Sequence, residues 1–365
     1  MKMTFRYFGA QSDAVPLWKI KQIPGMSGVM GVLDKKAPGE VWEEDEIRAY
    51  VDEVHSAGLE CEVIESVNVH EDIRMGLPTR DGYIKNYCAT VRNLAKYGVK
   101  VIIYNFMPVF DWLRTDLNRL IEEDGSYSMY YDEAEIEGLS PLDLVERMNA
   151  GSNGFSLPGW EKERMAELKT TLAHYAELDN EGLLKNYKYF LDGVIPACEE
   201  CGVKLACHPD DPAWPLFALP RLAHSEEGLA RILALNPSKA HALCICTGSL
   251  GAAPENDLPR IIRRFGAEGR VGCVHIRNIK RLGWRKFREA SHLAADGDLD
   301  MYSIVKAVYD TCPEVYVRPD HGRMIWGETG RPGYGLYDRA LGVAYLNGLF
   351  EAVERSSAAL GEEKN

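Results

Sequence analysis

Four positions in the second half of the chain carry side chains that commonly bind metal ions. They are His208, Cys246, His275 and Asp320, and each comes at the end of a short run of apolar and β-branched residues. Such runs predict buried strands. Because the strands of a parallel barrel end on one face, residues that lie one strand–helix repeat apart converge there. Two imidazoles, a thiolate and a carboxylate at one place predict a divalent metal site.

The joint position of these residues, more than any one of them, favours a metal. A buried histidine by itself is more often a hydrogen-bonded core residue than a ligand. Thiolate and imidazole favour Zn²⁺ or Fe²⁺, whereas carboxylate and water favour Mn²⁺. A mixed set with open positions is typical of a catalytic site. Three further cysteines of the same runs, Cys207, Cys244 and Cys273, are expected to be core side chains.

Polar side chains close to the predicted ligands are candidates for binding a substrate. Arginine suits a carboxylate, because its guanidinium presents a planar fork of donors. A histidine closes the stretch 287–292, which we expect to be a polar loop on the active-site face. The candidates are Arg277, Asn278, His292 and Arg318. Asp210 and Asp211, in a loop stiffened by two prolines, either reach the site or cap the next turn.

Two side chains are candidates for transferring protons. His321 adjoins the predicted ligand Asp320, and an imidazole is a common general acid or base. Tyr334 lies between Gly333 and Gly335, so little local packing holds its ring, and it is free to enter a cavity. The competing interpretation of Tyr334 is a surface aromatic.

The order of predicted elements indicates an α/β protein with a (β/α)8 barrel. Eight strand-like runs alternate with amphipathic helical patterns, and short connections between them predict parallel strands. The runs are 4–8, 28–33, 59–64, 99–106, 203–207, 242–246, 271–275 and 315–317. The clearest helical patterns are 44–57, 81–97 and 184–200, each ending at or near a glycine.

One long segment interrupts this alternation. We expect residues 1–365 to form a single catalytic barrel domain, with 107–180 as a partly helical insertion after the fourth strand and a helix at 160–175. The insertion could cap the barrel mouth or build a subunit contact, and we expect a homodimer or a higher homo-oligomer.

Composition and motifs exclude several classes of protein. The net charge of −13 argues against nucleic acid as a partner. The chain has neither a phosphate-binding GxxxxGK[ST] motif nor a GxGxxG opening a helix, so no nucleotide cofactor is expected. No apolar run is long enough to span a bilayer, and no signal peptide is recognisable. Nine cysteines, several in apolar runs, suit a reducing compartment. We therefore expect a cytoplasmic enzyme without a membrane partner.

Several motifs together resemble those of the mannonate dehydratases of hexuronate (glucuronate) catabolism. They are Phe-Arg-Tyr-Phe-Gly at the N-terminus, Ile-Cys246-Thr-Gly-Ser, Cys-Val-His275-Ile-Arg-Asn, Arg-Pro-Asp320-His-Gly and Gly-Tyr334-Gly-Leu-Tyr-Asp-Arg-Ala-Leu-Gly. The resemblance runs nearly end to end. It implies a xylose-isomerase-like barrel that uses Mn²⁺, with Fe²⁺ as the other possible ion, and converts D-mannonate to 2-keto-3-deoxy-D-gluconate and water.

The same resemblance implies roles for individual residues. His208, Cys246, His275 and Asp320 fall at the family's metal positions, and His321 and Tyr334 fall where it has proton-handling residues. A sugar isomerase or epimerase on the same barrel is the alternative, although the cysteine ligand argues against the carboxylate-rich sites of aldose–ketose isomerases. A metal-dependent nucleic-acid-binding barrel is a second rival, and the acidic net charge argues against it.

Overall fold

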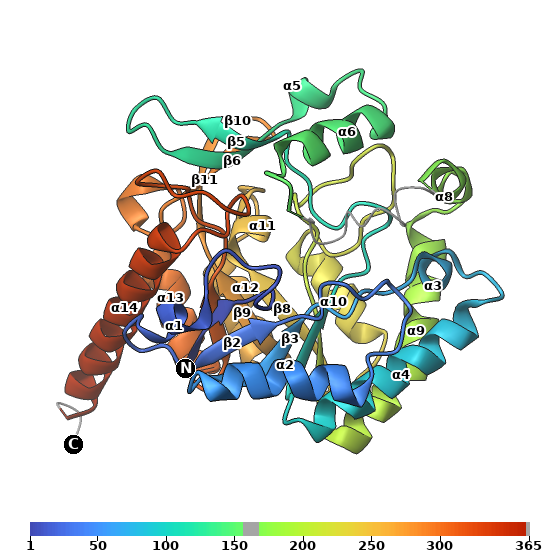
Figure 1. The fold of residues 1–365 in the computed structure, drawn as a ribbon, viewed down its shortest axis with the longest axis horizontal. Coiled ribbons are helices and arrows are strands. Elements are labelled where there is room, and N and C mark those ends of the chain that lie inside the picture. Colours follow the sequence, from blue (N-terminus) through green and yellow to red (C-terminus); the bar gives the residue numbers. More distant parts are fainter. Residues whose placement is uncertain (156–167, 363–365) are drawn as a thin grey trace.

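Eight parallel strands close into a barrel in the computed structural model, which describes residues 1–155 and 168–362 (Figure 1). The strands are β1 (Lys2–Arg6), β2 (Gly28–Gly31), β3 (Glu60–Glu65), β4 (Val101–Tyr104), β7 (Lys204–Cys207), β8 (His241–Cys246), β9 (Val271–Ile276) and β12 (Tyr316–Pro319). Around the barrel they follow the order β1-β12-β9-β8-β7-β4-β3-β2. Each coincides with a predicted run, so the predicted fold class is confirmed.

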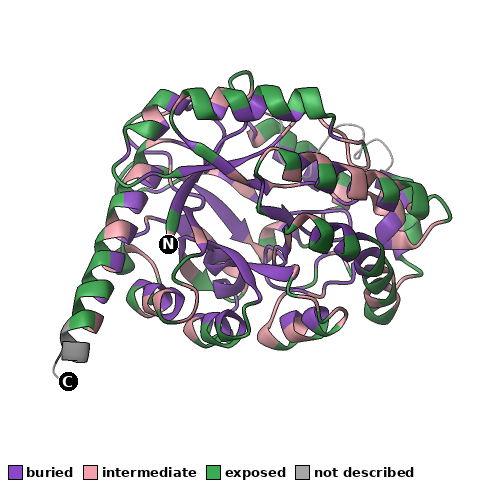
Figure 2. Ribbon diagram, turned by 90° about the horizontal axis from the view of Figure 1, so that it is seen from below, coloured by how far each residue is buried: buried purple, intermediate pink, exposed green. Residues whose placement is uncertain are grey.

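Helices surround the barrel, and their exposed residues face outward (Figure 2). They are α1 (Leu17–Lys21), α2 (Glu44–Ser56), α3 (Glu71–Met75), α4 (Arg80–Lys96), α5 (Glu133–Ile136), α6 (Pro141–Gly151), α8 (Leu168–Tyr175), α9 (Asn180–Cys201), α10 (Glu226–Ala234), α11 (Thr247–Gly251), α12 (Leu258–Ala267), the 3-10 helix η1 (Ala294–Asp296), α13 (Met301–Thr311) and α14 (Tyr337–Glu362). In the described ranges, none of them is long and apolar enough to cross a bilayer.

Local sequence explains where the main helices begin and end. A capping box between Glu43 and Glu46 opens α2, because each side chain satisfies a backbone N–H of the first turn. After α4 and α9 the chain reverses at Gly98 and Gly202, whose φ angles of 86° and 67° are left-handed and favour glycine. Each reversal feeds the next barrel strand directly. The three predicted helices 44–57, 81–97 and 184–200 are confirmed as α2, α4 and α9.

The apolar core has two layers. One layer fills the space between the strands and the surrounding helices, and the other fills the barrel interior. The interior layer contains Met30, Val63, Val101, Ile103, Ala206, Cys244 and Cys273. Cys207 is also buried, in the outer layer, so all three of these cysteines lie in the core, and Cys244 in addition lies close to the predicted ligands His208 and His275.

A second, antiparallel sheet beside the barrel was not predicted. Its strands are β5 (Asp116–Leu120), β6 (Tyr127–Asp132), β10 (Asn278–Gly283) and β11 (Lys286–Ala290), in the order β10-β11-β6-β5. The prediction of a polar loop at 287–292 is therefore wrong for its first four residues: they lie in β11, where Phe287 and Glu289 are buried. The loop was inferred from local polarity, whereas β11 is a strand because it pairs with β6 from a distant segment.

The segment 107–180 contributes β5, β6, α5, α6 and α8 within its described part. Figure 1 shows β5, β6, α5 and α6 together at the top of the molecule, next to β10 and β11. The predicted helix 160–175 corresponds to α8 over Leu168–Tyr175, and its remaining residues, 160–167, lie outside the described residues.

Candidate active site

The four predicted metal-binding side chains lie at the carboxyl ends of neighbouring barrel strands. His208 follows β7 directly, and Cys246 is the last residue of β8. His275 lies one residue before the end of β9, and Asp320 follows β12. The barrel places these strands side by side in the order β7-β8-β9-β12, with Cys246 in register with His275. Strand order and register therefore bring residues far apart in sequence to one end of the barrel.

Their ligand atoms lie close enough together to share an ion. Ligand atoms of Cys246, His275 and Asp320 all lie within 4.8 Å of one another. A second group at the same spacing consists of His208, Cys244 and His275. The ring centres of His208 and His275 are 5.3 Å apart. Because His275 belongs to both groups, all these side chains form one cluster.

The surroundings of the cluster fit a divalent ion. Nε2 of His275 is buried and makes no hydrogen bond to the described residues, an arrangement that is unfavourable unless another partner occupies the position. Nδ1 of His208 lies 2.8 Å from the carbonyl oxygen of Pro209, the kind of contact that orients a metal-binding imidazole through its other nitrogen. Thiolate, imidazole and carboxylate together are donors for a transition metal.

Positive charges keep the carboxyl group of Asp320 ionised. Burial acts to raise its pKa, but His321, Arg318 and Arg277 outweigh burial and hold the pKa well below its usual value. Nη2 of Arg318 lies 2.5 Å from Oδ1, and Nε of Arg277 lies 2.8 Å from Oδ2. Asp320 is therefore a carboxylate, the form that binds a metal.

A buried ion-pair network extends from Asp320 to the second sheet. Arg277 contacts Asp211 at 2.8 Å and Glu289 at 2.5 Å. Arg114 joins the same two carboxylates, Asp211 at 2.8 Å and Glu289 at 2.7 Å. All of these side chains are nearly inaccessible to solvent. Since every charge has an opposite partner, the network holds Arg277, and through it Asp320, in one position.

A cavity lies over the candidate metal ligands at the barrel mouth. It encloses about 500 Å³ of space, part of it open to solvent. Its wall includes two of the predicted ligands, His208 and Asp320, and both predicted proton-handling residues. Asp211 also lines it, whereas Asp210 turns away and accepts a hydrogen bond from the backbone N–H of Ala223 at 2.8 Å. Of the two aspartates, Asp211 thus reaches the site.

His321 and Tyr334 form a hydrogen-bonded pair in this cavity. Nε2 of His321 lies 2.9 Å from the Tyr334 hydroxyl, and Nδ1 lies 3.6 Å from Oε1 of Glu289. Burial raises the pKa of Tyr334 to about 12, although Arg318 opposes the shift. The phenol is therefore protonated at neutral pH. The tyrosine between two glycines is buried in the cavity wall and is not a surface aromatic.

The predicted substrate-binding residues fall at different places. Arg318 lines the cavity, and Arg277 lies behind Asp320 in the buried network. Asn278 instead stabilises the backbone around it, since its side chain accepts hydrogen bonds from the N–H groups of Ile279 and Leu299, which precedes α13. His292 is buried against α14, and neither it nor Asn278 is among the described residues that line the cavity.

Sequence reasoning missed Glu65, the last residue of β3, which lies beside the candidate ligands. Its Oε2 is 3.0 Å from Nη1 of Arg318 and 3.5 Å from Nε2 of His275. Burial acts to raise its pKa, but Arg318, His275 and Arg6 lower the pKa to about 2. A carboxylate that ends an apolar strand run is the same signal that marked Asp320. Arg6, at the end of β1, is a second missed residue of the cavity wall.

The fold and site define a barrel enzyme with a candidate metal centre at the carboxyl ends of its strands. A protein-family model described as D-mannonate dehydratase (UxuA) matches residues 1–359. The chain therefore belongs to the D-mannonate dehydratase family, and it is a hydro-lyase.

Individual relatives agree with this assignment over the full length. The chain is 66% identical to a mannonate dehydratase of Lachnoclostridium phytofermentans, over 98% of this chain and 100% of the relative. It is 53% identical to a mannonate dehydratase of Thermotoga neapolitana, over 97% and 98% of the two chains. The crystal structure of mannonate dehydratase from Streptococcus suis superposes with a TM-score of 0.88 at 39% identity, covering 98% of this chain and 96% of that one.

A more distant likeness concerns the fold alone. A xylose isomerase domain protein from Planctomyces limnophilus gives a TM-score of 0.54 at 11% identity, covering 97% of this chain and 98% of that one. The expected xylose-isomerase-like barrel is thereby confirmed.

Proposed function

We propose that this protein converts D-mannonate to 2-keto-3-deoxy-D-gluconate and water. The observation that carries the proposal is the family match over residues 1–359, together with relatives of 53–66% identity over nearly the whole chain. The cavity at the barrel mouth supports it, because it combines candidate metal ligands with a proton-transfer pair.

The reaction removes a proton from C2 and a hydroxyl group from C3 of the sugar acid. The C2 proton is only weakly acidic, because the adjacent carboxylate already carries a negative charge. A divalent ion, held by His208, Cys246, His275 and Asp320, would supply Lewis-acid stabilisation of the enediolate charge. The enol left after loss of water tautomerises to the 2-keto acid.

His321 and Tyr334 supply the two proton-transfer groups. The Tyr334 phenol is protonated at neutral pH, which suits the donor that helps the C3 hydroxyl to leave as water. The His321 imidazole, whose Nε2 lies 2.9 Å from the Tyr334 hydroxyl, is suited to act as the base that takes the C2 proton. Arg318, on the cavity wall, suits the substrate carboxylate.

We infer that the physiological ion is Mn²⁺, with Fe²⁺ as the alternative. The carboxylate and the open positions favour Mn²⁺, while the thiolate and imidazoles also suit Fe²⁺. The proposed reaction requires no nucleotide. Metal-free protein reloaded with each ion separately, and assayed under anaerobic conditions, distinguishes the two by the activity recovered.

The product identifies the reaction. D-mannonate incubated with purified protein and Mn²⁺, without nucleotide, should give a product positive in a 2-keto-3-deoxy acid assay, and NMR should show a CH₂ group at C3. A product that NMR identifies only as an epimer or a ketose would contradict the dehydratase and favour the isomerase alternative.

We also propose that residues 1–365 act as one catalytic domain, with 107–180 as its insertion, and that the protein is a cytoplasmic homodimer or higher homo-oligomer. All nine cysteines are free, which supports a reducing compartment. An apolar surface groove between α1 and α14 is lined by three exposed side chains, Trp18, Trp326 and Leu341. Apolar side chains gathered on the surface in this way support association with a second copy of the chain. Light scattering during size-exclusion chromatography measures the oligomeric state, and a monomer at micromolar concentration would contradict this part.

A further inference from the structure

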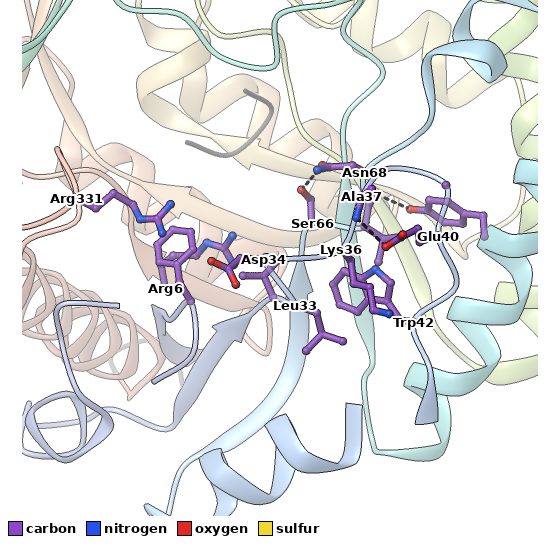
Figure 3. A pocket seen from close by; sticks show the side chains of 15 residues that line it. Arg6, Leu33, Asp34, Lys36, Ala37, Glu40, Trp42, Ser66, Asn68 and Arg331 are labelled. Atoms are coloured by element: carbon purple, nitrogen blue, oxygen red, sulfur yellow. Dashed lines mark hydrogen bonds between the residues drawn. The ribbon is translucent and has the colours of Figure 1, made fainter. Parts of the chain in front are cut away.

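A second hollow adjoins the catalytic cavity at the barrel mouth (Figure 3). This side pocket lies over the ends of β1, β2 and β3, and it encloses about 630 Å³, part of it open to solvent. Residues of its wall include Arg6, Asp34, Glu40, Trp42, Ser66 and Asn68. Figure 3 shows Arg6 and Asp34 on one side of the pocket and Glu40 and Trp42 on the other.

The two hollows share part of their walls. Arg6 and Ser66 line both the catalytic cavity and the side pocket. The candidate metal ligands His208 and Asp320 line the catalytic cavity alone. The side pocket is therefore a direct neighbour of the catalytic cavity, and the two meet at Arg6 and Ser66.

Arg6 keeps a donor available at this junction. The side chain is only 3% exposed, and Nη1 donates to the carbonyl oxygens of Met30 at 3.3 Å and Gly31 at 3.1 Å. Its buried Nε makes no hydrogen bond to the described part of the chain. A buried guanidinium with an unused donor is unfavourable unless a ligand or water accepts from it.

The charges and apolar surfaces of the side pocket suit neutral hydroxyl groups. Asp34 lies within electrostatic range of Arg331, and its carboxylate accepts no hydrogen bond from the described residues. Because the wall carries the carboxylates of Asp34 and Glu40 as well as the cations Arg6 and Arg331, a hydroxyl group, which both donates and accepts, finds partners among both kinds of side chain. Trp42 offers an aromatic wall for the C–H faces of a sugar chain.

We propose that the side pocket binds the C5–C6 hydroxyl end of the open-chain sugar acid, while its carboxylate and C2 to C4 lie in the catalytic cavity. This assignment rests on the proposed dehydratase function. The side pocket then determines chain length: six-carbon aldonic acids bind more tightly than shorter ones that present the same groups to the metal.

Substrate truncation combined with pocket variants tests the assignment. L-Erythronate has the carboxylate and the C2 and C3 configuration of D-mannonate but lacks its two distal carbons. Asp34→Ala removes an acceptor, and Ala37→Leu narrows the pocket. Each variant, loaded with Mn²⁺, should raise KM for D-mannonate by about 5- to 10-fold. In Asp34→Ala this is the scale of one lost hydrogen bond, and in Ala37→Leu the larger side chain takes up space that the distal carbons would occupy. The kcat of each variant and the inhibition constant of L-erythronate should stay within about twofold of wild type.

Lys35→Ala is the matched control, because Lys35 is exposed in the same loop and does not line the side pocket. Lys35→Ala should leave KM for D-mannonate and the inhibition constant of L-erythronate unchanged. Melting curves should show that all three variants are folded. If wild type is not inhibited by L-erythronate, the distal carbons carry most of the affinity, and the KM rise in Ala37→Leu then locates where they bind.

Failure of the proposed function and failure of the side-pocket assignment give different results. Wild-type protein that forms no 2-keto-3-deoxy acid from D-mannonate would contradict the proposed function. The side-pocket assignment alone would be overturned if the wild type is active but Asp34→Ala and Ala37→Leu keep the wild-type KM. It would also be overturned if both variants weaken the binding of D-mannonate and of L-erythronate equally.

Discussion

Cys246 is the residue whose replacement tests the metal site most directly. Cys246→Ser nearly conserves volume but replaces a thiol with a hydroxyl, a far poorer ligand at neutral pH. We expect the variant to fold and to lose most of its metal, as measured by elemental analysis after dialysis. Cys88→Ser, a half-buried thiol outside the candidate site, is the control and should keep the wild-type metal content. Full metal occupancy in Cys246→Ser would show that Cys246 is only a core side chain.

Tyr334 allows proton transfer to be separated from metal binding. Tyr334→Phe removes the hydroxyl that lies 2.9 Å from Nε2 of His321 and leaves the ring in place. We expect kcat to fall by about 100-fold or more, the scale of a lost general acid or base. Because the loss falls on the transition state, KM and metal content should change little. Turnover of D-mannonate at a near wild-type rate would reduce Tyr334 to a wall of the cavity.

At the scale of elements, the second sheet supports the catalytic site from outside the barrel. β11 carries Glu289, and the segment before β5 carries Arg114, so both halves of this sheet reach the network behind Asp320. The pairing of β6 with β11 joins the insertion to the connection that follows β9. The segment 107–180 therefore helps, through Arg114, to hold the network that contains Arg277.

Glu289→Ala tests this support. The substitution removes one of the two carboxylates that pair with the buried guanidinium of Arg114 and one of the three that pair with that of Arg277. Breaking a buried ion pair on one side costs roughly 3–5 kcal/mol, so urea unfolding should show a loss of that order. The neighbouring Arg288→Ala, only half-buried, is the control and should cost less than about 1 kcal/mol. Equal stability of the two variants would contradict a supporting role for the network.

At the scale of the whole molecule, the candidate ligands come from four strands, so an ion bound there ties one side of the barrel together. An ion that binds only the folded state raises stability by an amount that grows with the logarithm of the ratio of its concentration to its Kd. Protein stripped with a chelator should therefore lose activity and melt at a lower temperature, and Mn²⁺ should restore both. Cys246→Ser is the control, and its melting temperature should respond far less to Mn²⁺. Full activity in metal-free protein would contradict the metal-dependent mechanism.

Much of the fold was predictable because its signals are local. Barrel strands such as β4, β8 and β9 are nearly continuous apolar runs, since a strand of a parallel barrel is buried on both faces. Glycines such as Gly98 and Gly202 mark the helix ends. The second sheet was missed because its strands are short and partly polar, and β11 is stabilised by pairing with β6, more than 150 residues away in sequence. No local pattern records such a partner.

The candidate site, like the fold, was predictable in part from local sequence. Sequence by itself determined the placement of His208, Cys246, His275 and Asp320, because strand ends of a parallel barrel share one face. Only the tertiary structure decided that Asp211 and not Asp210 reaches the cavity, that Asn278 braces a loop, and that Glu289 and Arg114 complete the ion pairs behind the site. The physical reason is that a buried charge needs an opposite partner, and Arg114 finds its partners Asp211 and Glu289 97 and 175 residues away along the chain.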